Sequence, residues 1–150
     1  MEFACEEYSD ELIEECKPLF KAHYQEIEKF QDIPLEPNYS QYKSARNQKI
    51  LKIFTAREHG VVIGYSFFFV LNSPHYKNSR QAVQDLVFVY KHSRKGFVGI
   101  RFIKWCDKQL RKDGVQVIFR QVTPQNNFGK ILMRQGYQLH EALYAKRTDN

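Results

Sequence analysis

The chain has 150 residues, of which 43% are hydrophobic and 27% charged, and its formal net charge is +6. This length and composition predict one soluble domain, residues 1–150, with a single packed core. We find no apolar run long enough to span a membrane and expect no secretory leader, so the predicted location is the cytoplasm. Three widely spaced cysteines show no metal-ligand spacing, which favours free thiols and no metal.

The first half of the chain predicts two helices followed by a β-hairpin. Ser9 is a typical N-cap, and acidic residues and apolar residues at helical spacing follow it. Pro18 lies inside this helix and is expected to kink or split it, because proline lacks an N–H donor and clashes with the preceding turn. Tyr39–Gln48 is expected to be a short second helix. Ile50–Thr55 and Val61–Leu71 are the hairpin strands, and the second should be central because it is apolar on both faces.

The second half alternates strands and helices. We predict a strand at Ala82–Val89, a helix at Val98–Lys112, a strand at Val115–Val122, a short helix at Asn127–Arg134 and a last strand at Tyr137–Lys146. Together with the hairpin, this order predicts an α/β chain of the α+β mixed type, in which helices lie on the faces of a mixed sheet.

A strand, a basic loop with glycines and a helix meet near the middle of the chain. Gly96 and Gly99 stand in the loop and at the helix start, and residues 91–112 carry eight basic side chains against one acid, Asp107. Such a junction presents unpaired backbone N–H groups and the positive end of a helix dipole to a phosphate. It therefore predicts an anionic ligand, although the basic side chains also fit a solvated helix face.

The segment Arg94–Gly99 resembles the strand-to-helix motif of the GNAT superfamily of N-acetyltransferases. In that motif, Gln or Arg is followed by two residues, Gly, one residue, and Gly or Ala. Arg94 and Gly99 match its ends, whereas Phe97 replaces its central glycine. The later segment Arg134–Tyr137 resembles the closing helix of the family and its Gly-Phe or Gly-Tyr corner.

Three other segments, Lys17–Ile27, Asp32–Leu35 and Gln81–Asp85, resemble small members of the superfamily found in bacteriophages and prophages. The resemblance implies the acyl-CoA N-acyltransferase (GNAT) fold: a central mixed, mostly antiparallel sheet with a V-shaped splay, flanked by helices. It also implies an N-acetyltransferase of the EC 2.3.1 type. Such an enzyme transfers an acetyl group from acetyl-CoA to a primary amine by direct attack in a ternary complex.

The same resemblance assigns the residues that hold acetyl-CoA. Loop amides would bind the diphosphate, strand residues would pair with the pantetheine arm, and the diverging strands would admit the thioester. The phenyl ring of Phe97 brings bulk close to the place of the diphosphate. The loop amides, which form the cradle for the diphosphate, can still point inward if the ring turns into the core under the helix. The implied cofactor-binding residues are Val87, Phe88, Val89, Arg94, Lys95, Gly96, Phe97, Val98, Gly99 and Asn126.

Acetyl transfer to an amine also needs a base, because a lysine-like amine is mostly protonated at neutral pH. Asp85 is the first candidate, and strand alternation places it on one face with Val87 and Val89. The alternative is a strand-end carboxylate bonded to a neighbouring loop. His75 and Tyr76 lie in the loop before that strand, where members of the family often shape the acceptor pocket. His75 is a second candidate base, acting through water, and the alternative is a surface residue.

Many relatives use a tyrosine in the closing helix to protonate the leaving thiolate. In this chain the corresponding residue is Leu132, so Tyr144 or Tyr137 would have to take that role. No cysteine stands where a covalent nucleophile is expected, because Cys106 should face the core.

Two other functions stay open from the sequence. Phe97 and Leu132 both depart from the family, so the chain is alternatively a catalytically decayed GNAT-fold protein of phage origin that binds a host protein or nucleic acid. The positive charge also suggests a toxin that acetylates aminoacyl-tRNA. The missing tyrosine counts against such a toxin, and the lack of interleaved aromatic residues counts against nucleic acid as a partner. The acceptor, a small molecule or a protein amine, is not specified, and pairing of two chains through the last strand is a further expectation.

Overall fold

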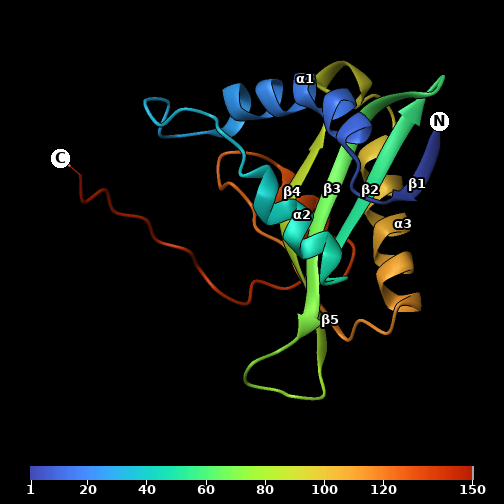
Figure 1. The fold of residues 1–150 in the computed structure, drawn as a ribbon, viewed down its shortest axis with the longest axis vertical. Helices are drawn as coiled ribbons and strands as arrows, with labels where there is room; N and C mark the ends of the chain where they lie inside the picture. The colour runs from blue at the N-terminus through green and yellow to red at the C-terminus, as the bar shows by residue number, and fades with distance from the viewer. Residues whose placement is uncertain (150) are drawn as a thin grey trace.

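A computed structural model describes residues 1–149 (Figure 1). Its centre is a five-stranded sheet in the order β1-β2-β3-β4-β5, with antiparallel neighbours except for the parallel pair β4 and β5. The strands are β1 Glu2–Glu6, β2 Leu51–Glu58, β3 Val61–Asn72, β4 Arg80–Val89 and β5 Val117–Phe119. The helices are α1 Asp10–Ile27, α2 Tyr39–Asn47, α3 Val98–Lys112 and α4 Phe128–Met133, with a 3₁₀ turn at Lys91–Ser93. The predicted mixed, mostly antiparallel sheet flanked by helices is confirmed.

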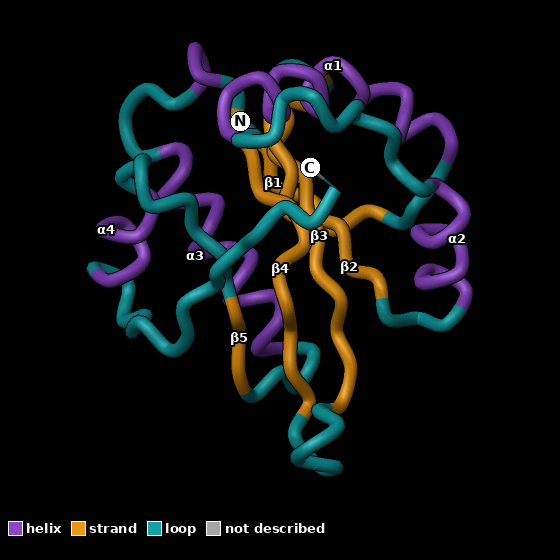
Figure 2. The backbone as a smooth tube through the Cα atoms, turned by 90° about the vertical axis from the view of Figure 1, so that its left-hand side faces the viewer, coloured by secondary structure: helices purple, strands orange, loops and turns teal. Residues whose placement is uncertain are grey.

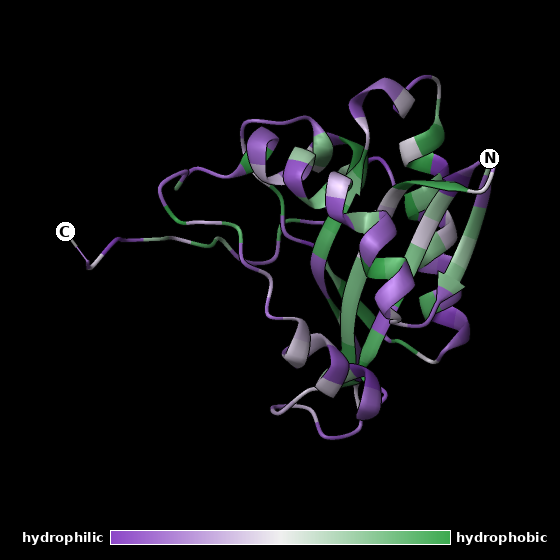
Figure 3. Cartoon of the chain, turned by 45° about the horizontal axis from the view of Figure 1, so that its top comes forward, coloured by the Kyte–Doolittle hydropathy of each residue, from purple (hydrophilic) through white to green (hydrophobic). Residues whose placement is uncertain are grey.

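Helices cover both faces of the sheet (Figure 2). Strand β3 supplies both cores, since successive side chains of a strand point to opposite faces. Tyr65 and Phe67 pack under α1 and beside α2, whereas Phe68 packs under α3. This confirms the prediction that β3 is a central strand, and Figure 3 shows that the strands are the most hydrophobic part of the chain.

Helix α1 begins where the sequence predicts it. The Ser9 hydroxyl accepts a hydrogen bond from the Leu12 N–H at 3.1 Å, which satisfies one of the free donors of the first turn. Of the two predicted effects of Pro18, a kink or a split, the split does not occur, since α1 continues to Ile27. Pro18 lies on the exposed side of α1, where water can satisfy the carbonyl that loses its partner.

Two strands of the sheet differ from the prediction. Strand β1 was not predicted, because its short sequence contains two acids; it pairs with β2 at the edge of the sheet, where Glu6 binds Arg57. The strand predicted at Val115–Val122 is shortened to the three residues of β5.

The predicted last strand, Tyr137–Lys146, is wrong. This segment has no regular secondary structure and joins no strand of the sheet (Figure 1). Its end is held instead by Arg147, whose guanidinium donates to both carboxylate oxygens of Asp32 at 3.0–3.1 Å and lies 5.4 Å from the ring of Phe30. Residues 137–146 thus have the sequence pattern that predicted a strand, but no strand of the sheet pairs with them.

Candidate functional site

Strands β4 and β5 part after three paired residues. Gln81–Val83 pair with Val117–Phe119, and β4 then continues to Val89 without β5 beside it. Beyond the paired residues, two hydrogen bonds of the Gln84 side chain link β4 to the residues after β5: its amide donates to the Gln121 carbonyl at 3.3 Å, and its carbonyl accepts from Arg120 at 3.0 Å. The strands therefore form the V-shaped splay that the resemblance implied.

A buried guanidinium occupies the base of the splay. The side chain of Arg120 is 0% exposed and donates to the carboxylate of Asp107 at 2.7 Å, to the Tyr137 hydroxyl at 2.9 Å and to the Gln84 side-chain carbonyl at 3.0 Å. The Tyr137 hydroxyl in turn donates to Asp107 at 2.9 Å. Because the charge of Arg120 is paired and hydrogen-bonded, it can remain buried.

Sequence reasoning missed this network, because its members come from β4, α3 and two later segments. One signal was available: Asp107 is the only acid among the basic residues 91–112. The network also engages Tyr137, one of the two candidates for protonating the thiolate. Burial raises the pKa of Tyr137 to about 12, and its neighbours leave its hydroxyl already bonded.

The free edge of β4 faces the splay. The Tyr90 N–H donates to the Ile63 carbonyl of β3, and backbone groups of a strand alternate in direction, so those of Val87 and Val89 point away from β3. The Val89 carbonyl is already bonded, at 2.8 Å, to the Nε of Arg94. Phe88 has its backbone on the β3 side and its ring in the core under α1.

The side chain of Arg94 holds the loop to α1. Its two terminal nitrogens bind the two carboxylate oxygens of Glu26 at 2.6 and 2.9 Å. This pairing holds the pKa of the Glu26 carboxyl below its ordinary value. Any contribution of Arg94 to phosphate binding would therefore come from its backbone, while its side chain fixes the shape of the loop.

The loop and the start of α3 leave room for an anion. Gly96 has a φ of +65°, which only glycine adopts readily, and a Cβ atom added at Gly96 or Gly99 would have no neighbour within 4 Å. No side chain caps the first turn of α3, so its N–H groups lack a side-chain acceptor. Together with the exposed Lys95, this geometry fits the diphosphate of a CoA ester.

Phe97 neither packs in the core nor closes the loop. Its side chain is 73% exposed, so the ring does not turn into the core under α3, which was the condition that the sequence set for an open cradle. Its backbone, at φ −107° and ψ 23°, immediately precedes α3.

A β-bulge sets the direction of Asp85. Phe67 pairs with Leu86 and Phe68 with Gln84, so Asp85 is an extra residue opposite the β3 ladder. Its carboxylate accepts a hydrogen bond from the Tyr42 hydroxyl of α2. The predicted alternation is therefore wrong: Asp85 lies on the α1/α2 face with Leu86, whereas Val89 packs toward α3.

Burial changes the acidity of both members of this pair. The half-buried site raises the pKa of Asp85 above its ordinary value, and the bond from Tyr42 offsets part of that effect. Burial and the neighbouring carboxylate raise the pKa of the Tyr42 hydroxyl as well, so it stays a donor. Asp85 is thus a stronger base than an exposed aspartate.

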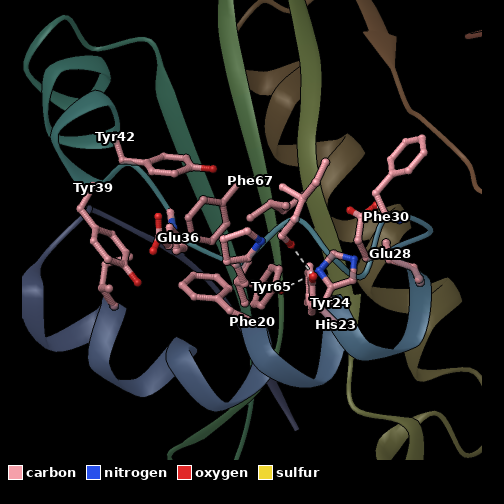
Figure 4. A pocket seen from close by; sticks show the side chains of 17 residues that line it. Phe20, His23, Tyr24, Glu28, Phe30, Glu36, Tyr39, Tyr42, Tyr65 and Phe67 are labelled. Carbon is pink, nitrogen blue, oxygen red and sulfur yellow. Dashed lines mark hydrogen bonds between the residues drawn. The ribbon is translucent and has the colours of Figure 1, made fainter. Parts of the chain in front are cut away.

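A cavity of about 380 Å³ lies beside this pair (Figure 4). It is enclosed by α1, α2, the connector of residues 28–38 and the sheet, and sequence reasoning did not predict it because the connector has no periodicity. His23 and Tyr65 form a buried pair in its wall, with 2.8 Å between the imidazole Nδ1 and the hydroxyl oxygen. Burial lowers the pKa of His23 to about 4, so its imidazole is neutral.

Four predicted residues lie outside this arrangement. The strand that would have placed Tyr144 near the site is absent, and this side chain is 92% exposed in the C-terminal segment. His75 and Tyr76 lie in the exposed turn between β3 and β4, and neither lines the cavity. The side chain of Asn126 accepts a hydrogen bond from the Phe128 N–H at the start of α4.

Residues 1–149 contain neither a metal-binding cluster nor a membrane-spanning helix. No cluster of three or more His, Cys, Asp or Glu side chains is arranged to hold a metal ion. Among the helices of the same range, none combines the length and apolar character needed to cross a membrane.

Solved structures of acetyltransferases resemble this chain over nearly its whole length. The ribosomal-protein-alanine N-acetyltransferase from Brucella melitensis biovar Abortus 2308 has a TM-score of 0.70 at 16% identity, covering 98% of this chain and 99% of that protein. An aminoglycoside acetyltransferase from an uncultured soil metagenomic sample, in complex with sisomicin, has a TM-score of 0.72 at 14% identity over 97% and 96% of the two chains. The chain has the GNAT fold. No protein-family model matches the sequence, and no curated protein is significantly similar to it.

A third solved structure contains CoA, the product that acetyl-CoA leaves after acetyl transfer. The aminoglycoside N-acetyltransferase AAC(6')-Iy, in complex with CoA, has a TM-score of 0.68 at 14% identity and covers 99% of this chain and 100% of its own. At these identities, the likeness establishes the fold and leaves the activity to be argued from the site.

Proposed function

We propose that the chain is an acetyl-CoA-dependent N-acetyltransferase that acts on a primary amine by direct transfer in a ternary complex. The observation that carries this proposal is the splay of β4 from β5, next to an uncapped helix start with Gly96 at a positive φ. An amine cavity on the other side of β4 supports it, because donor and acceptor then reach the same strand from opposite sides.

Bound acetyl-CoA supplies the thioester carbonyl that the amine attacks. We assign diphosphate binding to the backbone of Lys95–Gly99 and pantetheine pairing to the free edge at Val87. Phe88, Val89 and Arg94 shape that edge, and Asn126 lies at the start of α4, across the splay.

In the transfer step, the amine nitrogen forms a bond to the acetyl carbon, and the carbon–sulfur bond breaks. Asp85 accepts the proton that the amine loses, and Tyr42 fixes the direction of its carboxylate. The departing thiolate needs no protein acid, since a thiol with a pKa of about 8.5 is a moderate leaving group. No role is therefore required of Tyr144.

Calorimetry with acetyl-CoA and release of free thiol in the presence of an amine test the proposal. Asp85→Asn should lower kcat by about 10²–10⁴-fold and leave the affinity for acetyl-CoA unchanged, because the carboxylate lies on the acceptor side of β4. Tyr42→Phe, which keeps the ring and removes the donor, should give a smaller loss. Absence of acetyl-CoA binding at millimolar concentration would refute the proposal.

The exposed ring of Phe97 favours one alternative, a GNAT-fold protein whose cofactor site has decayed and which binds another macromolecule. Phe97→Gly separates the two functions. If the natural cradle is intact, this change should alter acetyl-CoA affinity little. A large gain in affinity would show that Phe97 obstructs the cradle and would support the alternative.

A further inference from the structure

The cavity beside Asp85 is small, and aromatic side chains form much of its lining. Its volume of about 380 Å³ lies near the lower end of the range for small-molecule sites, about 300–1,000 Å³. Tyr65 and Phe67 of the sheet line it together with Phe20 and Tyr39 of the helices (Figure 4). Leu86 of β4 lines it as well. Such walls favour a flat apolar body, because aromatic faces stack and gain little from hydroxyl groups.

The outer wall carries apolar side chains that face solvent. Ile27, Ile33 and Leu35 line the cavity and are nonetheless exposed. A ligand with an apolar body would cover these side chains favourably. A polyhydroxylated ligand would have to desolvate its hydroxyl groups to do the same, which costs free energy. The connector is therefore better suited to an apolar occupant.

The charge of the cavity has one sign. Its charged lining residues are Glu28 and Glu36, and no lysine or arginine lines it within residues 1–149. The Glu28 carboxylate accepts a hydrogen bond from the Phe30 N–H at 2.9 Å, which holds it in place. This field attracts a protonated amine and repels a ligand that also carries a carboxylate.

The inner end of the cavity is where the amine can react. Tyr42 lines the cavity and donates its hydroxyl hydrogen bond to Asp85, and Leu86 follows Asp85 directly on β4. An amine at this end would lie beside the proposed base, while its body occupies the aromatic part. We therefore place the amine beside Tyr42 and the apolar body against the remaining aromatic lining.

We propose that the acceptor is a small primary amine carried on an apolar, preferably aromatic, body that lacks a carboxylate. The inference rests on the proposed function, because it names the acceptor of that reaction. It excludes amino acids, linear polyamines and aminoglycosides as preferred acceptors. The first carry a carboxylate, and the others lack an apolar body that would fill the aromatic walls.

Four amines test the inference through the release of free thiol from acetyl-CoA: 2-phenylethylamine, phenylalanine, putrescine and sisomicin. Phenylalanine differs from 2-phenylethylamine only by its carboxylate, and putrescine keeps the amine without the ring. We expect kcat/KM for 2-phenylethylamine to exceed that for each of the others by at least about tenfold. An equal or higher value for any of the three would overturn the inference and leave the acetyltransferase function intact.

Calorimetry of 2-phenylethylamine, with and without bound CoA, tests the cavity independently of the chemistry. Binding should be detectable at millimolar amine. If acetyl-CoA binds and 2-phenylethylamine does not, the acceptor class is wrong. If acetyl-CoA itself does not bind, the proposed function fails, and the inference fails with it.

Two matched variants locate the bound amine. Leu35→Gln changes a cavity residue that is 44% exposed, and Leu71→Gln changes a residue of β3 that is 40% exposed and outside the cavity. Because both side chains face solvent, neither change should unfold the protein. Leu35→Gln should raise KM for 2-phenylethylamine at least about fivefold without changing KM for acetyl-CoA. Equal effects of the two variants would place the amine elsewhere.

Discussion

Buried His23 should make folding stability depend on pH. Its ring stacks on Phe88 with centroids 4.8 Å apart, and its Nδ1 lies 2.8 Å from the Tyr65 hydroxyl. Burial lowers its pKa to about 4, and Arg94 acts in the same direction while Glu26 opposes it. The perturbation is a change from about pH 7.5 to about pH 5, which protonates this histidine in the unfolded chain and not in the folded one.

The sign and the size follow from proton linkage. The folded pKa lies below the unfolded value of about 6.5, so the unfolded state binds more protons between these values. The contribution of His23 to stability is fully present above about pH 6.5 and is lost as the pH falls toward 4. At pH 5, a folded pKa of about 4 corresponds to a loss of about 2 kcal/mol in the free energy of unfolding.

Urea unfolding of the natural chain and of His23→Gln at the two pH values measures this loss. Glutamine can keep a hydrogen bond with Tyr65 and does not titrate, so the other ionisable groups cancel in the comparison. The natural chain should lose about 2 kcal/mol more than the variant on going from about pH 7.5 to about pH 5. Equal losses in the two proteins, with equal m-values, would refute the reasoning.

Four further results are expected. Asp107→Asn should lower the free energy of unfolding by about 2–3 kcal/mol in urea titrations, below the roughly 3–5 kcal/mol of a fully buried pair, because it leaves Arg120 buried without a counter-charge while Asp107 itself is partly exposed. Arg147→Ala frees the C-terminal segment from the connector that walls the cavity, so KM for the amine should rise severalfold while kcat stays the same; a lower kcat alone would contradict this. A thiol reagent should label Cys5 in the folded protein and the two buried cysteines only in denaturant, which mass spectrometry can follow. The value of kcat/KM should fall as the pH is lowered through the raised pKa of Asp85, with a midpoint above the ordinary value of about 3.9, and a midpoint at or below it would exclude Asp85 as the base.

Local signals made most of the fold predictable. The Ser9 cap and the apolar character of β3 each act within a few residues of the chain, and the structure has both. The splay followed from the resemblance and not from periodicity. By contrast, β1 depends on its pairing with β2, about fifty residues away, and its acidic sequence gives no strand signal by itself.

The candidate site was less predictable, because its geometry depends on contacts between distant segments. The loop to which we assign diphosphate binding is contiguous and could be located at Gly96. The cavity needs α1, the connector and α2 to meet the sheet, and the neutral state of His23 depends on burial that no local pattern reports. The last predicted strand failed for the opposite reason, since its alternation was present but no pairing edge came with it.

The bulge at Asp85 has a consequence for the length of β4. On the two sides of Asp85, Gln84 packs toward Arg120 and Leu86 toward α1, so these two residues would alternate as in a regular strand if Asp85 were absent. Asp85 is therefore equivalent to a single-residue insertion that adds a carboxylate to the cavity side without moving any core residue to the other face. A chain in which Asp85 is deleted should keep its fold and the proposed acetyl-CoA site but lose the proposed base. Such a chain would show that a strand can gain a reactive group through its length as well as through its sequence.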